Sequence, residues 1–204
     1  MEEILPGVYD WTTRHERFDA DVHSHYLTSD DGGVIIDPRV PEEGIEWFRQ
    51  HGEPQGVLLT NRHHYRHSGQ FAEAYGCPVH CHEAGLHEFT KGERVEPFEH
   101  GDEPAGGFRA IEVGVLCPEE TAFHVDREGG IVMLGDCAVQ WGGRDLVFVP
   151  DEHLGDDPAA VKRGVRDSLR RLIDEFEFRH LLLAHGEPFV GSGKDALQKF
   201  VKGT

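Results

Sequence analysis

Histidines are frequent in this chain of 204 residues, which contains fifteen of them. Three of them, His63, His64 and His67, fall within five residues of one another. Imidazole is the commonest protein ligand of metal ions, and it also donates or accepts protons near neutral pH. His67 follows His63 by four residues, which is about one helical turn. The segment therefore indicates either a metal site or acid–base chemistry.

A second cluster of potential ligands contains the pair Cys77 and Cys81, together with His80 and His82. Cysteine and histidine at this density can bind zinc. However, residues 78–80 are expected to form a strand, in which neighbouring side chains point to opposite faces. Four ligands could not then converge on one ion, so we interpret these residues as structural.

Two weaker candidates lie elsewhere in the chain. His23 and His25 alternate on an expected strand and could be ligands or simply hydrogen-bonded residues. Cys117 could act as a nucleophile if His63 or His185 lay within reach as a base. The four cysteines are expected to be reduced thiols, because disulfides are rare in cytosolic chains.

The elements that position these residues follow from apolar periodicity and turn signals. Strands are expected at 4–11, 22–27, 34–37, 57–60, 78–80, 108–115, 121–125, 131–134 and 180–184. Helices are expected from Pro41 to just before Gly52 and at 68–75, 158–176 and 194–201. A turn at 30–33 joins two of the strands. This order favours an α/β (α+β) helix–sheet–sheet–helix sandwich over a doubly wound sheet.

Composition excludes several classes of function. The formal net charge of −18 would repel a phosphate backbone, so nucleic acid is not an expected partner. No apolar run approaches the roughly 20 residues that span a bilayer, so no membrane association is expected. We see no signal peptide, and a cytoplasmic location is expected by default. The length suits a single domain over 1–204.

Several segments, taken in order, resemble the metallo-β-lactamase superfamily. The strand 57–60 runs into Asn61-Arg62-His63-His64-Tyr65-Arg66-His67, where the superfamily has H-x-H-x-D-H. The flanking segments that match are Ile36-Asp37-Pro38, Gly114 to Thr121, Leu134-Gly135-Asp136 and Leu183-Ala184-His185-Gly186. The resemblance covers nearly the whole chain and implies a four-layer αββα sandwich.

The resemblance also implies a metal site, but one that is largely rewritten. In the superfamily, seven ligands hold two metal ions, typically zinc, and a bridging hydroxide attacks the substrate. Three ligand positions are retained here, as His63, Asp136 and His185. The other four hold Asn61, Tyr65, Arg66 and Leu116. This set implies at most one divalent ion, which would be zinc, iron or manganese, with Asn61 as a weaker oxygen ligand.

Arg66 is the most informative substitution, because arginine stays charged and cannot bind a metal ion. At ~4 Å and an effective dielectric constant of ~20, its repulsion of a divalent ion would be about 8 kcal/mol. If the side chain points inward, it is expected to pair with Asp136 and to replace the second metal ion. The alternative is that Arg66 points to solvent.

Three functions follow, and the first is that of a hydrolase-like protein acting on an ester, thioester or phosphoester. In it, Tyr65 or His67 would donate a proton and Arg66 would anchor an anionic group of a small-molecule substrate. The second is a metal-free relative that binds a small anion or a protein partner. The third is a mononuclear iron redox protein. The fold alone does not choose among them, because function depends on the site.

Overall fold

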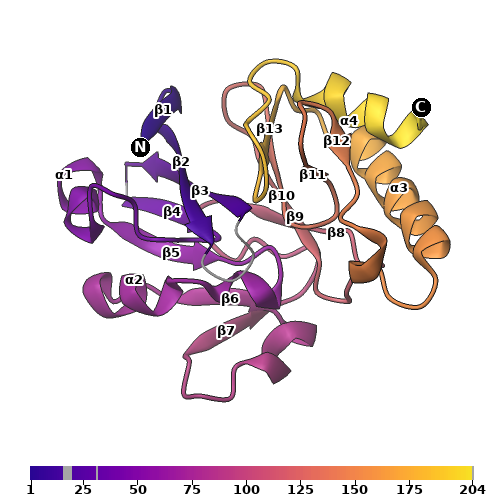
Figure 1. Ribbon diagram of the computed structural model, residues 1–204. Coiled ribbons are helices and arrows are strands. Elements are labelled where there is room, and N and C mark those ends of the chain that lie inside the picture. The colour runs from indigo at the N-terminus through magenta and orange to yellow at the C-terminus, as the bar shows by residue number, and fades with distance from the viewer. Residues whose placement is uncertain (16–19, 31, 204) are drawn as a thin grey trace.

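The computed structural model describes residues 1–15, 20–30 and 32–203. The expected turn at 30–33 includes Asp31, which lies outside this part of the chain. Two β-sheets face each other in the middle of the molecule, with α1 and α2 on the outer side of one sheet and α3 and α4 on the outer side of the other (Figure 1). Among the described residues, no helix is long and apolar enough to cross a membrane.

The first sheet has seven strands in chain order, and it changes from antiparallel to parallel pairing at β4. Its strands are β1 (Glu2–Leu5), β2 (Val8–His15), β3 (Ala20–Ser29), β4 (Gly32–Ile36), β5 (Pro54–Leu58), β6 (Val79–His82) and β7 (Val95–Phe98). Because β4, β5 and β6 are parallel, their carboxyl ends meet at one edge of the sheet.

The second sheet has four strands in the order β13-β10-β9-β8, and β10 pairs with β13 in parallel. These strands are β8 (Arg109–Glu112), β9 (Thr121–Val125), β10 (Ile131–Leu134) and β13 (His180–Leu183). A separate two-stranded ribbon consists of β11 (Val139–Gln140) and β12 (Leu146–Val147). The helices are α1 (Phe48–His51), α2 (Ser68–Tyr75), α3 (Pro158–Glu175) and α4 (Gly193–Lys202), with short 3-10 turns at Ile45–Trp47, Arg62–Tyr65, Glu83–Glu88 and Asp151–His153.

Alternating side chains divide the interior into three apolar layers. In β10, Ile131 and Met133 point into the layer between the two sheets, whereas Val132 and Leu134 point toward α3 and α4. Ile35 of β4 belongs to the third layer, beneath α1 and α2. A strand that is buried on both faces has a continuous run of apolar residues in its sequence. The sequence of β10 is such a run. Three layers of core between four layers of structure confirm the predicted αββα sandwich.

The predicted elements differ from the structure mainly where glycine and proline interrupt a pattern. The strand expected at 4–11 is two strands, because Pro6 and Gly7 form the turn between β1 and β2. The helix expected to begin at Pro41 is wrong as well. Gly44, with φ of 80°, precedes the 3-10 turn, and α1 begins only at Phe48. The helix at 68–75 is confirmed, and the next residue ends it in the left-handed conformation that glycine allows.

The cysteines of the second cluster lie apart from its histidines. Cys77 and Cys81 are free thiols within the apolar layer beneath α1 and α2. His82 instead accepts a hydrogen bond from the backbone of Ala84 and stacks on the ring of His100, with centroids 3.9 Å apart. In the described part of the chain, no cluster of potential metal ligands includes a cysteine.

The stacked pair predicts a loss of stability in acid. Burial, followed by the charge of His82, lowers the pKa of His100 from 6.5 to about 4. The unfolded chain therefore binds a proton at this residue before the folded chain does, so stability is full above pH 6.5 and falls as the pH drops toward 4. Because the His100 ring is only about half buried and solvent screens part of the effect, the loss at pH 5 is expected to be about 1 kcal/mol or less.

Urea unfolding at pH 7.5 and pH 5 would measure this effect in the wild-type protein and in the His100→Gln variant. The variant is expected to show a smaller difference between the two pH values. An equal difference in both proteins would assign the acid sensitivity to other groups.

Candidate metal centre

Asp37 organises the site from the carboxyl end of β4. Its buried carboxylate accepts hydrogen bonds from the backbone amide and the hydroxyl of Thr60, at 2.9 and 2.6 Å, and its Oδ2 lies 2.9 Å from Nδ1 of His64. Its backbone adopts a left-handed conformation, with φ of 49°, which aspartate tolerates better than most residues. Its carbonyl oxygen accepts a hydrogen bond from the hydroxyl of Ser24. One residue thus joins β3, β4 and the segment that follows β5.

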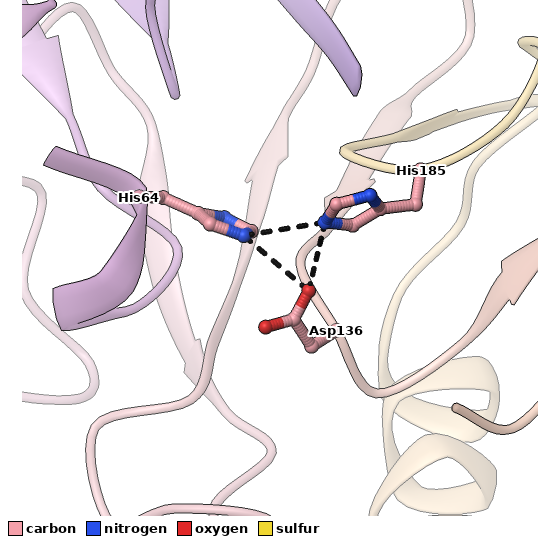
Figure 2. Close-up of side chains that lie close together, drawn as sticks. All are labelled: His64, Asp136 and His185. Atoms are coloured by element: carbon pink, nitrogen blue, oxygen red, sulfur yellow. Dashed lines mark hydrogen bonds and ion pairs between the residues drawn. The ribbon is translucent and has the colours of Figure 1, made fainter. Parts of the chain in front are cut away.

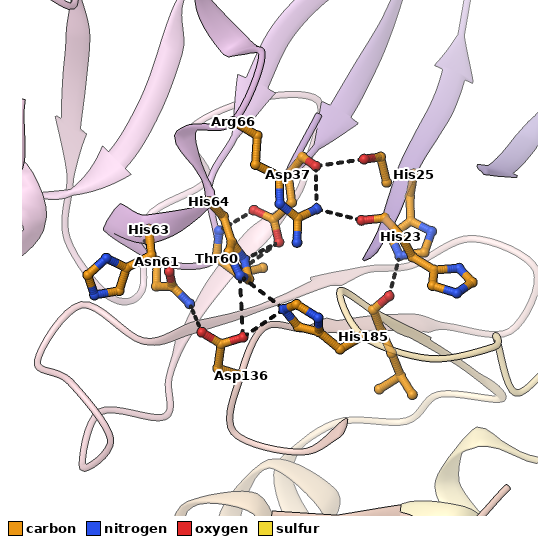
Figure 3. Close-up of polar contacts among 12 residues, drawn as sticks. His23, His25, Asp37, Thr60, Asn61, His63, His64, Arg66, Asp136 and His185 are labelled. Carbon is orange, nitrogen blue, oxygen red and sulfur yellow. Dashed lines mark hydrogen bonds and ion pairs between the residues drawn. The ribbon is translucent and has the colours of Figure 1, made fainter. Parts of the chain in front are cut away.

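The segment after β5 is a tight 3-10 turn that separates two neighbouring histidines. The side-chain oxygen of Asn61 accepts a hydrogen bond from the backbone amide of His63 and so begins the turn. His64 then points into the protein, where it is buried. His63 is exposed and points away from the site (Figure 3).

His64, Asp136 and His185 converge on one point, and their potential ligand atoms all lie within 4.8 Å of one another. Oδ1 of Asp136 lies 3.3 Å from Nε2 of His64 and 3.1 Å from Nε2 of His185 (Figure 2). The two Nε2 atoms are 3.4 Å apart, although their residues are separated by 121 positions along the chain. Three distant residues thus present two imidazole nitrogens and a carboxylate oxygen to each other.

The second sheet supplies two of these three residues. Asp136 lies two residues beyond β10 and His185 two residues beyond β13, and these strands are parallel neighbours. The carboxyl ends of parallel neighbours meet at the same edge of a sheet, so the two side chains come together. Gly135 is required between β10 and Asp136, because a Cβ there would lie 2.6 Å from the Thr60 hydroxyl and 2.9 Å from a carboxylate oxygen of Glu120.

Glu120 is a buried residue beneath the site that the sequence did not reveal. Its Oε1 accepts hydrogen bonds from the backbone amides of Asp136 and Cys137, at 2.7 and 3.0 Å. The amide of Asn61 bridges the two carboxylates, donating to Glu120 at 3.0 Å and to Asp136 at 3.1 Å. Burial, together with the charge of Asp136, raises the pKa of Glu120 to about 8. Glu120 therefore retains its proton to a higher pH than an ordinary carboxyl group does, and its hydrogen bonds hold the loop in place.

Charges within the cluster shift the pKa values of its members in opposite directions. Burial alone would lower the pKa of His64, but the carboxylates of Asp136 and Asp37 outweigh it and raise the pKa to about 9. Burial alone would raise the pKa of Asp136, but His64 and His185 hold it well below its usual range. Burial lowers the pKa of His185. With no metal ion bound, the cluster is therefore a buried imidazolium (His64) paired with the partly buried carboxylate of Asp136, beside a neutral imidazole (His185).

The donor set fits one divalent metal ion. Two imidazoles and a carboxylate suit zinc, iron and manganese, and leave coordination positions open. A ligand histidine usually donates its other ring N–H to a carboxylate, which fixes the tautomer. His64 meets this condition, since its Nδ1 faces Asp37 and Thr60 and its Nε2 faces Asp136. A cation at this point would take the place of the proton that His64 otherwise carries.

Arg66 points inward, but it does not form the predicted ion pair with Asp136. Its Nη1 donates to the carbonyl oxygens of His23 and Asp37, at 2.6 and 2.8 Å (Figure 3). Its Nη2 is buried and has no hydrogen-bond partner in the described part of the chain. The left-handed φ of 43° at Arg66 turns its side chain back toward the carbonyl oxygens of β3 and of the residue after β4, which accept from Nη1 alone. A buried cation therefore stands beside the cluster with one donor free.

Solved structures of metallo-β-lactamase proteins match this chain over most of its length. A family member from Thermus thermophilus is 19% identical, covers 98% of this chain and 80% of its own, and has a TM-score of 0.63. TTHA1623 in a di-iron-bound form is 22% identical, with coverages of 91% and 96% and a TM-score of 0.67. An archaeal superfamily protein from Sulfolobus tokodaii is 15% identical, with coverages of 96% and 85% and a TM-score of 0.66.

This chain has the metallo-β-lactamase fold. The resemblance inferred from its sequence is thereby confirmed at the level of the fold. No protein-family model matches the sequence, and no curated protein matches it either. At identities of 13–22%, the solved structures establish the fold and leave the reaction open.

Within this metallo-β-lactamase fold, the predicted ligands Asp136 and His185 come together, but the predicted ligand His63 does not join them. His64 occupies the third place. The sequence correspondence puts His63 at the retained position, whereas the 3-10 turn directs the following side chain inward instead. Asn61, predicted as a weak oxygen ligand, uses its oxygen to cap the turn and its nitrogen to bind Asp136. In this structure it presents no free oxygen to the cluster.

Tyr65 and His67, the predicted proton donors, do not line the cavity into which His64, Asp136 and His185 open. Tyr65 packs against the layer beneath α1 and α2, with its ring centroid 5.5 Å from that of Phe89. Nδ1 of His67 accepts a hydrogen bond from the backbone amide of Val40 at 2.9 Å. Neither residue lines the cavity, because the turn at Arg66 sends the chain into α2 and away from the site. The structure thus does not bring these two side chains to the cluster.

Leu116 and Cys117 lie in the segment 114–121, which matches the superfamily, and both line the pocket. Leu116 contributes apolar surface there, and Cys117 lies beside it. Burial, followed by the charge of Glu120, raises the pKa of the Cys117 thiol far above its usual range. A thiol that stays protonated is a poor nucleophile. His23 and His25, the other weak candidates, instead face the carboxylate of Asp10, each with its Nδ1 3.0 Å from an oxygen.

Removing the charge of Arg66 is expected to increase metal affinity. Arg66→Gln keeps an amide that can donate to the two carbonyls but removes the repulsion of a divalent ion. Affinity for zinc, measured by calorimetry on metal-free protein, is expected to rise at least about tenfold, which corresponds to about 1.4 kcal/mol. Arg66→Lys keeps the charge and serves as the matched control. Equal affinities in the glutamine variant and the wild type would show that the guanidinium does not act on the bound ion.

Proposed function

We propose that this protein is a metal-dependent hydrolase of the metallo-β-lactamase fold that binds one divalent ion through His64, Asp136 and His185. The observation that carries the proposal is the convergence of three ligand atoms within 4.8 Å, with His64 oriented by Asp37. TTHA1623, to which this chain is similar, has been solved in a di-iron-bound form. Both the identity of the metal and the number of ions bound to this protein belong to the proposal.

A divalent ion at this point would supply Lewis-acid chemistry for the hydrolysis of an ester, thioester or phosphoester. The protein's own residues would do the rest. Asp37 holds the ring of His64 in one tautomer, and Asn61 holds the second oxygen of Asp136. Arg66 offers a buried positive charge beside the cluster, which would attract an anionic group of the substrate.

The test is to measure metal content and hydrolysis in the same preparation. Protein purified without added metal and without a histidine tag would be analysed for its elements and then assayed with nitrophenyl esters, a thioester and a phosphodiester. About one equivalent of metal is expected, with hydrolysis that is lost in chelator and restored by zinc, iron or manganese. Full hydrolysis in metal-free protein would contradict the metal dependence.

A metal-free protein that binds a small anion is the second candidate, and Arg66 is the observation that favours it. Its free donor lies beside a cluster whose charges already balance without an ion, since His64 is protonated and Asp136 is ionised. In that case excess zinc would not bind, and an anion would bind in the presence of chelator. Metal content therefore separates the two candidates.

A further inference from the structure

The cluster opens into a pocket of about 440 Å³. This volume lies within the roughly 300–1,000 Å³ that is usual for small-molecule sites. Its lining includes Val139 of β11 and Trp141, which follows that strand. Apart from Cys117, the lining residues fall into two sets, one charged or imidazole-bearing and one apolar.

The charged set is basic, although the protein as a whole is strongly acidic. The chain carries 38 acidic and 20 basic side chains. Among the described residues that line the pocket, the arginines are Arg62 and Arg66, and the single acid is Asp136. Arg62 is already paired with the buried Glu119, and Asp136 is paired with two histidines. Nη2 of Arg66 is buried and has no hydrogen-bond partner among the described residues, so the pocket is complementary to a small anion beside this residue.

The apolar set consists of Ala20, Val22, Leu116, Val139, Trp141 and Val149. Trp141 is 56% exposed, which makes it the most exposed large apolar side chain in the described part of the chain. An exposed indole at the mouth of a pocket with a buried cation indicates a ligand that brings apolar surface of its own.

We infer that the pocket recognises a carboxylic acid with an extended apolar chain, which is the acyl product of an ester or thioester. The carboxylate would lie at Arg66, and the chain would lie along Leu116 and Trp141. This inference rests on the proposed function and assigns its substrate class. Hydrolysis adds one water across the acyl C–O or C–S bond and releases this acid with an alcohol or a thiol.

The test measures binding of straight-chain carboxylates from acetate to decanoate to metal-free protein in chelator. Fluorescence of Trp141 and calorimetry would report binding, and Trp141→Phe would assign the fluorescence signal, because Trp11 is buried and Trp47 is stacked on His51. Each added methylene is expected to tighten binding about threefold to fourfold until the wall is covered. Leu116→Gln is expected to flatten this dependence. Val190→Ala removes exposed apolar surface outside the pocket and is expected to leave it unchanged.

Two comparisons identify the charge that is recognised. Alkylamines of the same chain lengths are expected to bind at least tenfold more weakly than the carboxylates, and Arg66→Gln is expected to weaken all the carboxylates by a similar factor. Affinity independent of chain length, or equal binding of amines, would overturn the inference. Because these measurements need neither metal nor turnover, the proposed hydrolase activity can fail while the ligand class holds, and the reverse is also true.

Discussion

Replacing His64 with alanine is expected to weaken metal binding by more than about 100-fold, whereas replacing its neighbour His63 should change it by less than about threefold. Loss of a residue that merely orients a ligand costs about 10–100-fold, and His64 supplies one of the three converging atoms itself. His63 is exposed, and its side chain points away from the cluster. The two variants delete the same side chain at adjacent positions, so each controls for the other.

Zinc binding to metal-free protein would be measured by competition with a coloured chelator, with thermal unfolding to verify that both variants fold. His185→Ala is a second ligand variant and is expected to behave like His64→Ala. A loss of affinity confined to His63→Ala would show that the ligand is the histidine that the sequence motif indicates. In that case the turn at 62–65 would have to rearrange when metal binds.

Replacing Asp37 with alanine is expected to lower the free energy of unfolding by about 3–5 kcal/mol. Removing one member of a buried ion pair leaves the other uncompensated, and here the protonated His64 would lose a carboxylate 2.9 Å away. The amide and hydroxyl of Thr60 would also lose their acceptor. For a chain of this size, the midpoint of thermal unfolding should fall by about 6–20 °C.

Asp167→Asn is the matched control for this prediction, because its ion pair with Arg170 is exposed on α3. Such pairs contribute less than about 1 kcal/mol. Thermal unfolding at pH 7 would be compared for both variants. Asp37→Ala should also weaken metal binding about 10–100-fold, because His64 would lose its orienting partner. A melting temperature close to that of the control would mean that water or another side chain replaces the carboxylate.

The elements that position the site were largely predictable from the sequence. The strands at 121–125 and 131–134 and the helix at 68–75 have the bounds that apolar periodicity and glycine stops indicate. These elements are predictable because their patterns depend on local geometry, with a repeat of about two or 3.6 residues. The strand β7 was not predicted, because Glu96 and Pro97 separate its two apolar residues. The β11–β12 ribbon was not predicted either, since strands of two residues carry too little pattern.

The site was only half predictable, and Arg66 shows why. The sequence alone determined that this residue is a permanent cation where the superfamily binds a second metal ion. The sequence did not determine which groups accept hydrogen bonds from the guanidinium. In the structure, the left-handed backbone at Arg66 directs Nη1 to the carbonyl oxygens of His23 and Asp37 instead of to Asp136.

The choice between His63 and His64 was likewise decided by the tertiary structure. The sequence by itself determined the fold, the positions of Asp136 and His185 just after expected strands, and the presence of histidines in the turn after β5. That those two strands are parallel neighbours emerged only from the structure. Adjacent residues in a 3-10 turn point about 120° apart, so a difference of one position exchanges an exposed side chain for a buried one. The cap at Asn61 is local, and the contact of His64 with Asp37 forms within the first sheet. The contact of His64 with Asp136 exists only once the two sheets have packed together.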